Sequence, residues 1–246
     1  MKRLLPLVGL TVALACRATA PTPPPESPAT PAGAEAAFRP PTAIRWVRDS
    51  AEHDALFRQV FRSATVHVEQ QAATREAGTW AVVADADETV IDNSLYQVER
   101  AKEGLGFTPE SWHLWTERRA AVPLPGARAF LARVRELGGR IAIVTNRRTS
   151  ECPDTEAVFQ EHGLVYDVML CRPDDAPSDK TPRFESVTDG TTPAGLPPLD
   201  VVAILGDNIL DFPGMDQSLR REGASAFADF GARYFVLPNP MYGSWE

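Results

Sequence analysis

Cysteine and histidine are scarce in this sequence, and neither occurs in a metal-binding pattern. The 246 residues include three cysteines and four histidines, and the cysteine spacing does not match the paired ligands of a zinc site. Basic residues are also few. The 25 Lys and Arg stand against 33 Asp and Glu, for a net charge of −8, which argues against a nucleic-acid polymer as partner.

Common catalytic motifs are absent as well. The chain has no Gly-x4-Gly-Lys-Ser/Thr loop, no Gly-x-Ser-x-Gly elbow and no His-Glu-x-x-His. These absences exclude a P-loop nucleotide-binding protein, a serine hydrolase with a nucleophile elbow and a zinc protease with the His-Glu-x-x-His motif.

The apolar run at the N-terminus is too short for a transmembrane helix. It extends from Leu4 to Ala15 behind Lys2 and Arg3, and a helix of that length covers about 18 Å of a hydrocarbon core about 30 Å thick. The pattern is typical of a signal peptide over residues 1–15. We expect cleavage before Cys16 and lipidation of that cysteine. The alternative is an ordinary cleavage after Ala15 that leaves Cys16 free.

Proline is concentrated at the same end of the chain. Nine of the 22 prolines lie in the first 41 residues, so we predict a lipidated cysteine and a Pro-rich tether over residues 16–41. Residues 42–246 carry a net charge of −10 and are numerous enough for one domain with its own core. We expect an exported protein, either anchored by lipid at the outer membrane or cell surface, or free in the periplasm or medium. In such a compartment Cys152 and Cys171 form a disulfide or remain two buried thiols.

Short apolar runs alternate with helical patterns in the rest of the chain. Asp49 and Glu52 fit a capping box that begins a long helix, and further helices are predicted after Pro125 and over residues 154–162. The predicted strands cover residues 79–84, 140–144, 165–170, 201–205 and 234–237. Continuous apolar strands between helices are typical of a parallel sheet buried on both faces. We therefore predict an α/β fold with a Rossmann-like parallel sheet flanked by helices.

Three of these strands end at polar residues, namely Asp85, Thr145 and Asp207. In open α/β sheets ligands bind beyond the carboxyl ends of the strands, so these residues are expected to share one crevice. Asp87 and Asp211 add two more carboxylates. Carboxylates packed together are unfavourable unless a cation neutralises them, and an all-oxygen ligand set suits Mg²⁺.

A magnesium ion in an acidic pocket requires an anionic partner, and phosphate fits this role. Thr145 can donate a hydrogen bond to it, Lys180 can place a charge on it, and Arg183 can assist or hold a carboxylate. Two carboxylates then permit covalent catalysis. One attacks phosphorus, and the other protonates the leaving oxygen and afterwards activates water.

The order of these segments resembles a known family. The segments are Asp85-Ala86-Asp87-Glu88-Thr89, Val144-Thr145-Asn146-Arg147, Lys180 with Arg183-Phe184, and Gly206-Asp207-Asn208-Ile209-Leu210-Asp211-Phe212. They are similar to the four motifs of the haloacid dehalogenase (HAD) superfamily, and most similar to the class C acid phosphatases, which are secreted or surface lipoproteins of bacteria. The resemblance runs from Trp46 to the end of the chain and includes Asp92-Asn93-Ser94 and the tail 237–246.

The resemblance implies a role for each matching residue. Asp85 would be the nucleophile and Asp87 the general acid and base. The metal site would use Asp85, Asp207, Asp211 and the main-chain carbonyl of Asp87, with Asp211 orienting water or Lys180. The phosphoryl group would be held by Thr145, Asn146 and Lys180. One segment departs from the family pattern, because residues 174–198 around Lys180 are Pro-rich and irregular.

The family also inserts a small helical cap after the first motif, here at about residues 94–123. Its aromatic side chains stack on the base or ring of the substrate, which implies Trp112 and, in the tail, Tyr242. The alternative for Trp112 and Trp115 is a place in the core of the cap. The implied substrate is a small phosphomonoester, either a nucleoside 5′-monophosphate or an aryl phosphate.

We therefore predict a Mg²⁺-dependent phosphomonoesterase, an acid phosphatase or 5′-nucleotidase that forms an aspartyl phosphate. Two alternatives are a non-catalytic surface lipoprotein that binds a phosphorylated ligand and a phosphotransferase that acts on an alcohol. The family includes dimers, so a homodimer is one of the assemblies that the resemblance allows.

Overall fold

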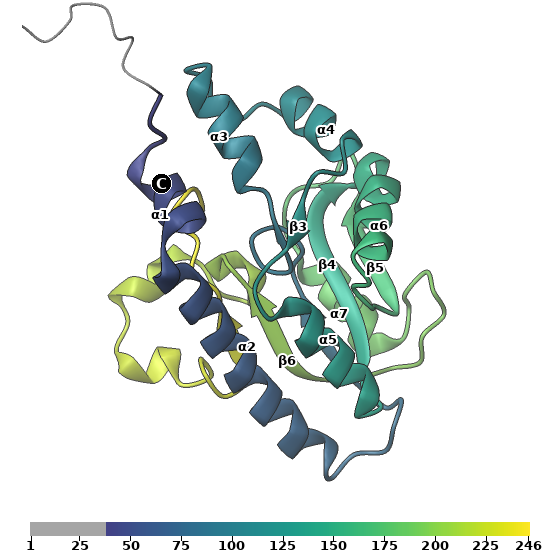
Figure 1. Ribbon diagram of the computed structural model, residues 1–246. Helices are drawn as coiled ribbons and strands as arrows, with labels where there is room; N and C mark the ends of the chain where they lie inside the picture. Colours follow the sequence, from purple (N-terminus) through teal and green to yellow (C-terminus); the bar gives the residue numbers. More distant parts are fainter. Residues whose placement is uncertain (1–37) are drawn as a thin grey trace, which may run out of the picture. The chain divides into compact units, whose positions relative to one another are not determined.

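A parallel five-stranded sheet forms the centre of the protein (Figure 1). The structure is a computed structural model that describes residues 38–246. The predicted signal peptide (1–15), Cys16 and residues 16–37 of the predicted tether lie outside the described residues. The helices and strands are α1 (Thr42–Asp49), α2 (Ala51–Ala72), β1 (Trp80–Ala84), β2 (Ile91–Asp92), α3 (Ser94–Lys102), α4 (Pro109–Glu117), β3 (Val122–Pro123), α5 (Ala127–Glu136), β4 (Arg140–Arg148), α6 (Cys152–Glu161), β5 (Val168–Arg172), α7 (Thr181–Asp189), β6 (Asp200–Gly206) and β7 (Tyr234–Val236).

The sheet has the strand order β5-β4-β1-β6-β7, and every neighbouring pair is parallel. Side chains alternate between its two faces, as the pleat requires. On β1, Val82 and Ala84 enter one apolar cluster, whereas Ala81 and Val83 enter the other. Both faces of the sheet are therefore buried, and the α/β prediction is confirmed.

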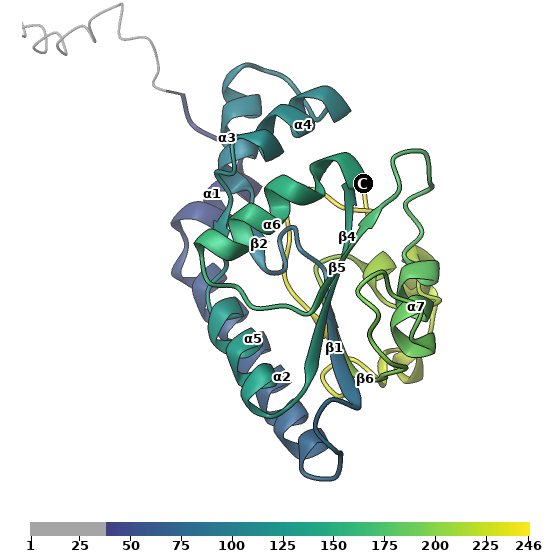
Figure 2. The same cartoon turned by 90° about the vertical axis from the view of Figure 1, so that its right-hand side faces the viewer.

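Helices cover both faces of the sheet. Phe57 of α2, Phe130 of α5 and Phe159 of α6 pack on one face, and Phe184 and Val187 of α7 pack on the other. Figure 2 shows α2 and α5 on one side of the sheet and α7 on the opposite side. Burial of each such side chain contributes about 1.5–3 kcal/mol to folding. No helix within residues 38–246 is long and apolar enough to cross a membrane.

The start of the long helix differs from the prediction. Asp49 is the last residue of a separate helix, α1, and the cap of α2 is Ser50. Ser50 has an extended backbone that separates the two helices, and its hydroxyl accepts a hydrogen bond from the His53 N–H at 3.2 Å. The capping box predicted at Asp49 and Glu52 is therefore wrong, because the neighbouring serine satisfies the free N–H.

The segment between β1 and β4 contains the helical insertion. Strands β2 and β3 pair antiparallel at its base, and α3 and α4 lie beyond the carboxyl ends of the central strands (Figures 1 and 2). Thr108 caps α4 by accepting a hydrogen bond from the Ser111 N–H at 3.1 Å, and Pro109 occupies the first turn, where its missing N–H has no cost.

The Pro-rich stretch 174–198 is more regular than the sequence indicates. It contains α7, with Lys180 at the N-cap and Pro182 in the first turn. Proline in the first turn removes no helical hydrogen bond, so Pro182 does not prevent the helix. The prediction that this whole stretch is irregular is wrong, and α7 fixes the position of Lys180.

Strand β4 continues beyond its predicted end at residue 144. It pairs with β5 at Val144↔Leu170 and again at Arg148↔Arg172. Between these two pairs β4 uses four residues where β5 uses two. The extra residues of β4 form a bulge at residues 145–147. A bulge re-aims the side chains within it, so Thr145 lies inside a distorted strand rather than after one.

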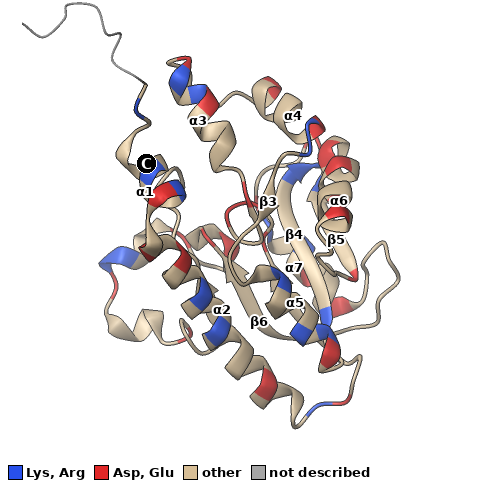
Figure 3. Ribbon diagram, in the orientation of Figure 1, with Lys and Arg blue, Asp and Glu red and all other residues tan. Residues whose placement is uncertain are grey.

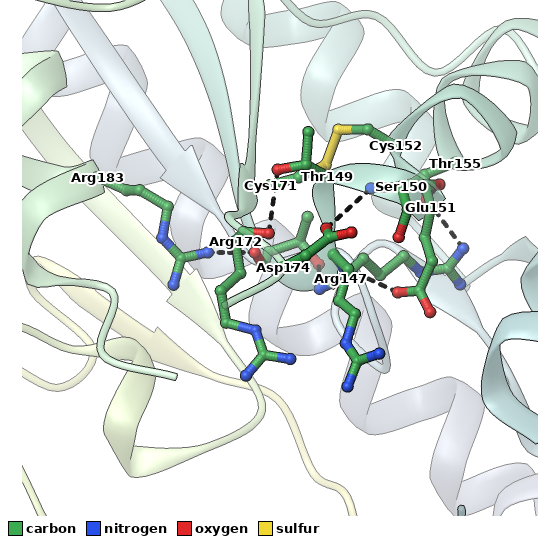
Figure 4. Close-up of a disulfide and its surroundings, with 12 residues drawn as sticks. Arg147, Thr149, Ser150, Glu151, Cys152, Thr155, Cys171, Arg172, Asp174 and Arg183 are labelled. Atoms are coloured by element: carbon green, nitrogen blue, oxygen red, sulfur yellow. Dashed lines mark hydrogen bonds between the residues drawn. A yellow bond between two sulfur atoms is a disulfide. The ribbon is translucent and has the colours of Figure 1, made fainter. Parts of the chain in front are cut away.

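The disulfide is one of the two alternatives left open by the sequence. Cys152, the first residue of α6, is bonded to Cys171 of β5, and Figure 4 shows this bond beside the end of β4. The bond joins α6 to the strand that carries Arg172.

Candidate active site

The carboxylates predicted to converge do so at the carboxyl ends of β1 and β6. Asp85 directly follows β1, Asp207 follows β6, and Asp211 ends the short turn 209–211. Carboxylate oxygens of these three residues lie within 4.8 Å of one another. They meet because β1 and β6 are neighbouring parallel strands. In Figure 3, acidic segments lie among the loops between the cap helices and β6.

Lys180 lies against two of these carboxylates. Its ammonium group donates to Asp85 and, at 2.6 Å, to Asp211, and the residue is 4% exposed. Burial acts to lower the pKa of Lys180, but Asp211 and Asp85 together raise it above its usual value. The lysine therefore stays protonated, and its predicted position in the site is supported by these contacts.

One lysine does not balance three carboxylates. Burial raises the pKa of Asp85 to about 7 against the opposing charge of Lys180, and the nearby Asp211 and Asp87 add to the increase. Burial, followed by repulsion from Asp211 and Asp85, also raises the pKa of Asp207 well above its usual value. A divalent cation would relieve this repulsion, and the donors are all oxygens, so the residues fit such an ion.

Neighbouring residues hold the carboxylates of β6 in place. Asp207 accepts hydrogen bonds from Asn239 at 2.8 Å and from Thr89 at 3.3 Å. Asp211 accepts the Asn208 N–H at 2.9 Å. Gly206 makes room for it, since a Cβ at this position would lie 2.3 Å from the Asp211 Cβ.

The side chain of Asp87 has a different environment. It accepts hydrogen bonds from Arg147 and from the Asn93 amide, the latter at 2.8 Å. It is not a member of the three-carboxylate group, so its predicted participation in the metal site rests on its main-chain carbonyl alone. Its side chain is thus available for the general acid and base role that the resemblance implies.

The predicted phosphate-binding residues of the second motif lie in the bulge of β4. Thr145 is fully buried, and its hydroxyl accepts the Arg147 N–H at 3.1 Å. Asn146 is exposed, and its side-chain carbonyl accepts a hydrogen bond from Arg183 at 2.7 Å. Arg183 also donates to the main-chain carbonyl of Thr145. These contacts attach the bulge to α7, the helix that directly follows Lys180.

The aromatic residues differ in exposure. Trp115 is buried and its indole N–H donates to Asn93 at 2.8 Å, so it belongs to the cap core. Trp112 is half-buried; its ring contacts Tyr96 edge-on, and the Arg147 guanidinium lies 5.5 Å from its centroid. Tyr242 is also half-buried, and its hydroxyl donates to Glu88.

Sequence reasoning missed two buried polar residues at this site, Arg147 and Glu88. Arg147 is 2% exposed and contacts both Asp87 and the cap. Glu88 accepts the Asn93 N–H at 2.9 Å, and burial together with Asp87 and Asp207 raises its pKa well above the usual value. Each of these residues stands inside a motif that the sequence had already marked. Residue type alone does not distinguish a buried charge from a solvated one, so only their position beside the aspartates could have indicated them.

Comparison with known proteins agrees with this geometry. A family model described as HAD superfamily, subfamily IIIB (acid phosphatase) matches residues 29–245. The chain is similar to the class C acid phosphatase from Bacillus anthracis with tungstate bound, at 30% identity over 82% of this chain and 84% of that chain, with a TM-score of 0.73. Another structure of the class C acid phosphatase from Bacillus anthracis gives 29% identity, the same coverage and a TM-score of 0.70. With its aspartates and lysine grouped at the carboxyl end of a HAD-like sheet, the chain belongs to HAD subfamily IIIB and is an acid phosphatase.

Proposed function

We propose that this protein is a Mg²⁺-dependent phosphomonoesterase that hydrolyses nucleoside 5′-monophosphates and aryl phosphates through an aspartyl phosphate. The observation that carries the proposal is the grouping of Asp85, Asp207 and Asp211 around Lys180. Such a group combines a nucleophile, a place for a cation and a positive charge for the phosphoryl oxygens.

The first step uses Asp85 and Asp87. A carboxylate oxygen of Asp85 attacks phosphorus, the bond from phosphorus to the ester oxygen breaks, and Asp87 transfers its proton to the departing oxygen. In the second step Asp87 removes a proton from water, which attacks the aspartyl phosphate. Phosphate leaves and Asp85 is restored.

The other residues bind and orient the phosphoryl group. Thr145 and Lys180 supply a hydroxyl and an ammonium group, and Asn146 offers an amide at the rim. The bound Mg²⁺ would be held by Asp85, Asp207, Asp211 and the Asp87 carbonyl, and it would supply positive charge to the phosphoryl oxygens. The tungstate in the Bacillus anthracis enzyme supports an oxyanion site, because tungstate is tetrahedral like phosphate.

The nucleotide part of the proposal rests on Trp112. Arg147 contacts both the Trp112 ring and the Asp87 carboxylate, so the half-buried indole lies one side chain away from the proposed general acid. When the phosphate of a nucleotide occupies the site, its base would be within reach of the flat Trp112 indole, which favours stacking.

The test is hydrolysis of phenyl phosphate and adenosine 5′-monophosphate by the full-length protein with Mg²⁺. We expect activity to be lost with EDTA, restored by Mg²⁺ and absent in Asp85→Asn. Asp200→Asn, at the opposite end of β6, is the matched control because the Asp200 side chain makes a single polar contact among residues 38–246, an exposed ion pair with Arg75. Activity that survives both Asp85→Asn and chelation would contradict the proposal.

A lipid anchor at Cys16 completes the proposed function. A basic start, a short apolar run and a cysteine after Ala15 support it, as does the Pro-rich segment that follows. We expect the mature protein to fractionate with membranes and to carry an acylated N-terminal cysteine by mass spectrometry. A soluble product in cells that express the wild-type chain, with an unmodified Cys16, would contradict the anchor.

A further inference from the structure

Two arginines face each other across the ends of β4 and β5. Arg148 and Arg172 are register partners in this parallel pair, so their side chains leave the sheet on the same face, on strands about 4.8 Å apart. Val168 and Leu170 of β5 pack in the cluster that contains α7, and the alternation of the strand places Arg172 on that same side. Like charges in this arrangement repel each other.

A third arginine approaches from α7. Arg183 donates to the Thr145 carbonyl, to the Asn146 side chain at 2.7 Å and to the Asp179 carbonyl at 3.1 Å. All three acceptors are uncharged. Burial lowers the pKa of the Arg183 guanidinium. The charge of Asp85 opposes this decrease, and the like charge of Arg172 adds to it. In Figure 4 the Arg183 guanidinium is directed toward the segment of Arg172, which follows the disulfide-bonded Cys171.

The acidic residues nearby do not pair directly with this arginine cluster. Asp174 accepts the Ser150 N–H at 3.1 Å, and Asp179 accepts the Thr181 N–H at 2.9 Å. Within residues 38–246, no carboxylate forms an ion pair with Arg148, Arg172 or Arg183, although the Ser150 N–H and, less strongly, the charge of Arg148 lower the pKa of the Asp174 carboxyl. The Nε of Arg172 is buried and has no hydrogen-bond partner among the described residues. The cluster therefore has three guanidinium groups without a direct ion pair among the described residues, and an unused buried donor.

We propose that Arg148, Arg172 and Arg183 form an anion subsite that binds a second anionic group, a phosphate or a carboxylate, on the phosphomonoester substrate. The place of the cluster indicates this ligand. Arg183 bonds to Thr145 and Asn146, the residues assigned to the scissile phosphoryl group, so an anion held here belongs to the same molecule or lies beside it. Guanidinium groups match the planar, bidentate geometry of carboxylates and phosphates.

This inference rests on the proposed function, because that function places the scissile phosphate at Thr145 and Lys180. It adds a preference among substrates: a phosphomonoester with a second anionic group is bound more tightly than the matched ester without it. The disulfide supports the arrangement because Cys171 directly precedes Arg172 and fixes the end of β5 to α6.

The experiment compares matched substrates in the full-length protein with Mg²⁺. Phenyl phosphate is paired with 4-carboxyphenyl phosphate, and adenosine 5′-monophosphate with adenosine 3′,5′-bisphosphate, so that the two arms distinguish a carboxylate from a phosphate. We expect the wild-type protein to have a higher kcat/KM for the substrate with the extra anion in at least one pair. In Arg172→Gln this preference should fall about tenfold or more, through KM, as one lost charge-assisted contact requires.

Two further variants make the result decisive. Arg148→Gln should reduce the same preference, and it provides a second test if Arg172→Gln folds poorly. Arg62→Gln, which removes an exposed arginine from α2 on the opposite face of the sheet, should leave the preference unchanged. Equal loss for both members of each pair, or no preference in the wild type, would overturn the subsite. Absence of phenyl phosphate turnover in the wild type would instead overturn the proposed function.

Discussion

Arg147 holds the carboxylate of Asp87 with two nitrogens of its guanidinium group. Nε and Nη2 donate to the same oxygen, at 3.0 and 2.8 Å. The remaining nitrogen donates to Thr155 of α6 at 3.1 Å, and Nη2 also reaches Asn93 at 3.0 Å. Arg147 thus fixes the proposed general acid relative to α6 and the base of the cap, which makes it a positioning residue.

Replacement of Arg147 by methionine is expected to lower kcat by about 10²-fold, because a positioned general acid contributes roughly 10²–10⁴-fold to such reactions. The loss should depend on the leaving group. Phenyl phosphate requires protonation of its departing oxygen more than 4-nitrophenyl phosphate does, so its kcat should fall further. Steady-state kinetics with the two esters measures the difference, and Arg147→Lys should recover part of it.

Arg62→Met is the control, because it removes an exposed arginine of α2 and leaves the contact between Arg147 and Asp87 intact. The idea of a positioning role would be wrong if Arg147→Met lowered the melting temperature but reduced kcat equally for the two esters. That pattern would describe a residue required for the fold alone.

The sequence predicts most of the sheet, but it predicts little of the local structure of residues 144–147, the second of the four motifs. Strand ends at Asp85 and Asp207 are visible because an apolar run stops at a charged residue. The bulge of β4 has no such mark, since Thr145, Asn146 and Arg147 read as ordinary polar residues after a strand. Only the pairing with β5 shows that the strand resumes at Arg148.

The same limit explains the errors at the helices. Ser50 and Asp49 are both good caps, and the choice between them depends on α1, a helix of only 8 residues. The prolines of residues 174–198 indicate irregular structure, although one of them, Pro182, stands in the first turn of α7, where proline is favoured. Tertiary contacts decided both cases: α1 contacts α2 and α3, and α7 packs Phe184 and Val187 on the sheet.

Removal of the disulfide is expected to lower the free energy of unfolding by about 3 kcal/mol. Cys152 and Cys171 are 19 residues apart, and closing a loop of this size restricts the unfolded chain by roughly that amount. Urea unfolding of Cys152→Ser/Cys171→Ser should therefore have a lower midpoint than the wild type. A reductant should lower the midpoint of the wild type and leave that of the double variant unchanged. Equal midpoints for oxidised wild type and double variant would contradict the prediction.

The stability of the metal-free protein is expected to fall as the pH rises from about 4 to about 7. The pKa of Asp85 is raised from 3.8 to about 7 in the folded protein. Between these values the folded state keeps a proton that the unfolded state has released, so the free energy of unfolding decreases with pH. Each unit of pKa difference corresponds to about 1.4 kcal/mol. In EDTA, the melting temperature should therefore fall by about 5 °C or more across this range.

Saturating Mg²⁺ should flatten this dependence, because the cation favours the ionised carboxylates that repel one another in its absence. Asp85→Asn should also reduce the slope in EDTA. Differential scanning calorimetry at several pH values measures both. A slope in EDTA that is the same in Asp85→Asn and in the wild type would exclude Asp85 as its source.

The contributions of Trp112 and Tyr242 to nucleotide binding can be distinguished with variants that remove different parts of each side chain. Trp112→Ala should raise the KM for adenosine 5′-monophosphate about 10-fold or more, since stacking of a base on an aromatic ring contributes roughly 1–3 kcal/mol. Its KM for glycerol 1-phosphate, which has no ring, should change little.

Tyr242→Phe keeps the ring but removes the hydroxyl that donates to the buried Glu88, whereas Tyr242→Ala removes both. If the ring of Tyr242 stacks, Phe retains nucleotide turnover and Ala loses it. Equal losses in Tyr242→Phe and Tyr242→Ala would instead show that Tyr242 acts through Glu88, which lies next to Asp87, and that Trp112 is the stacking residue by itself.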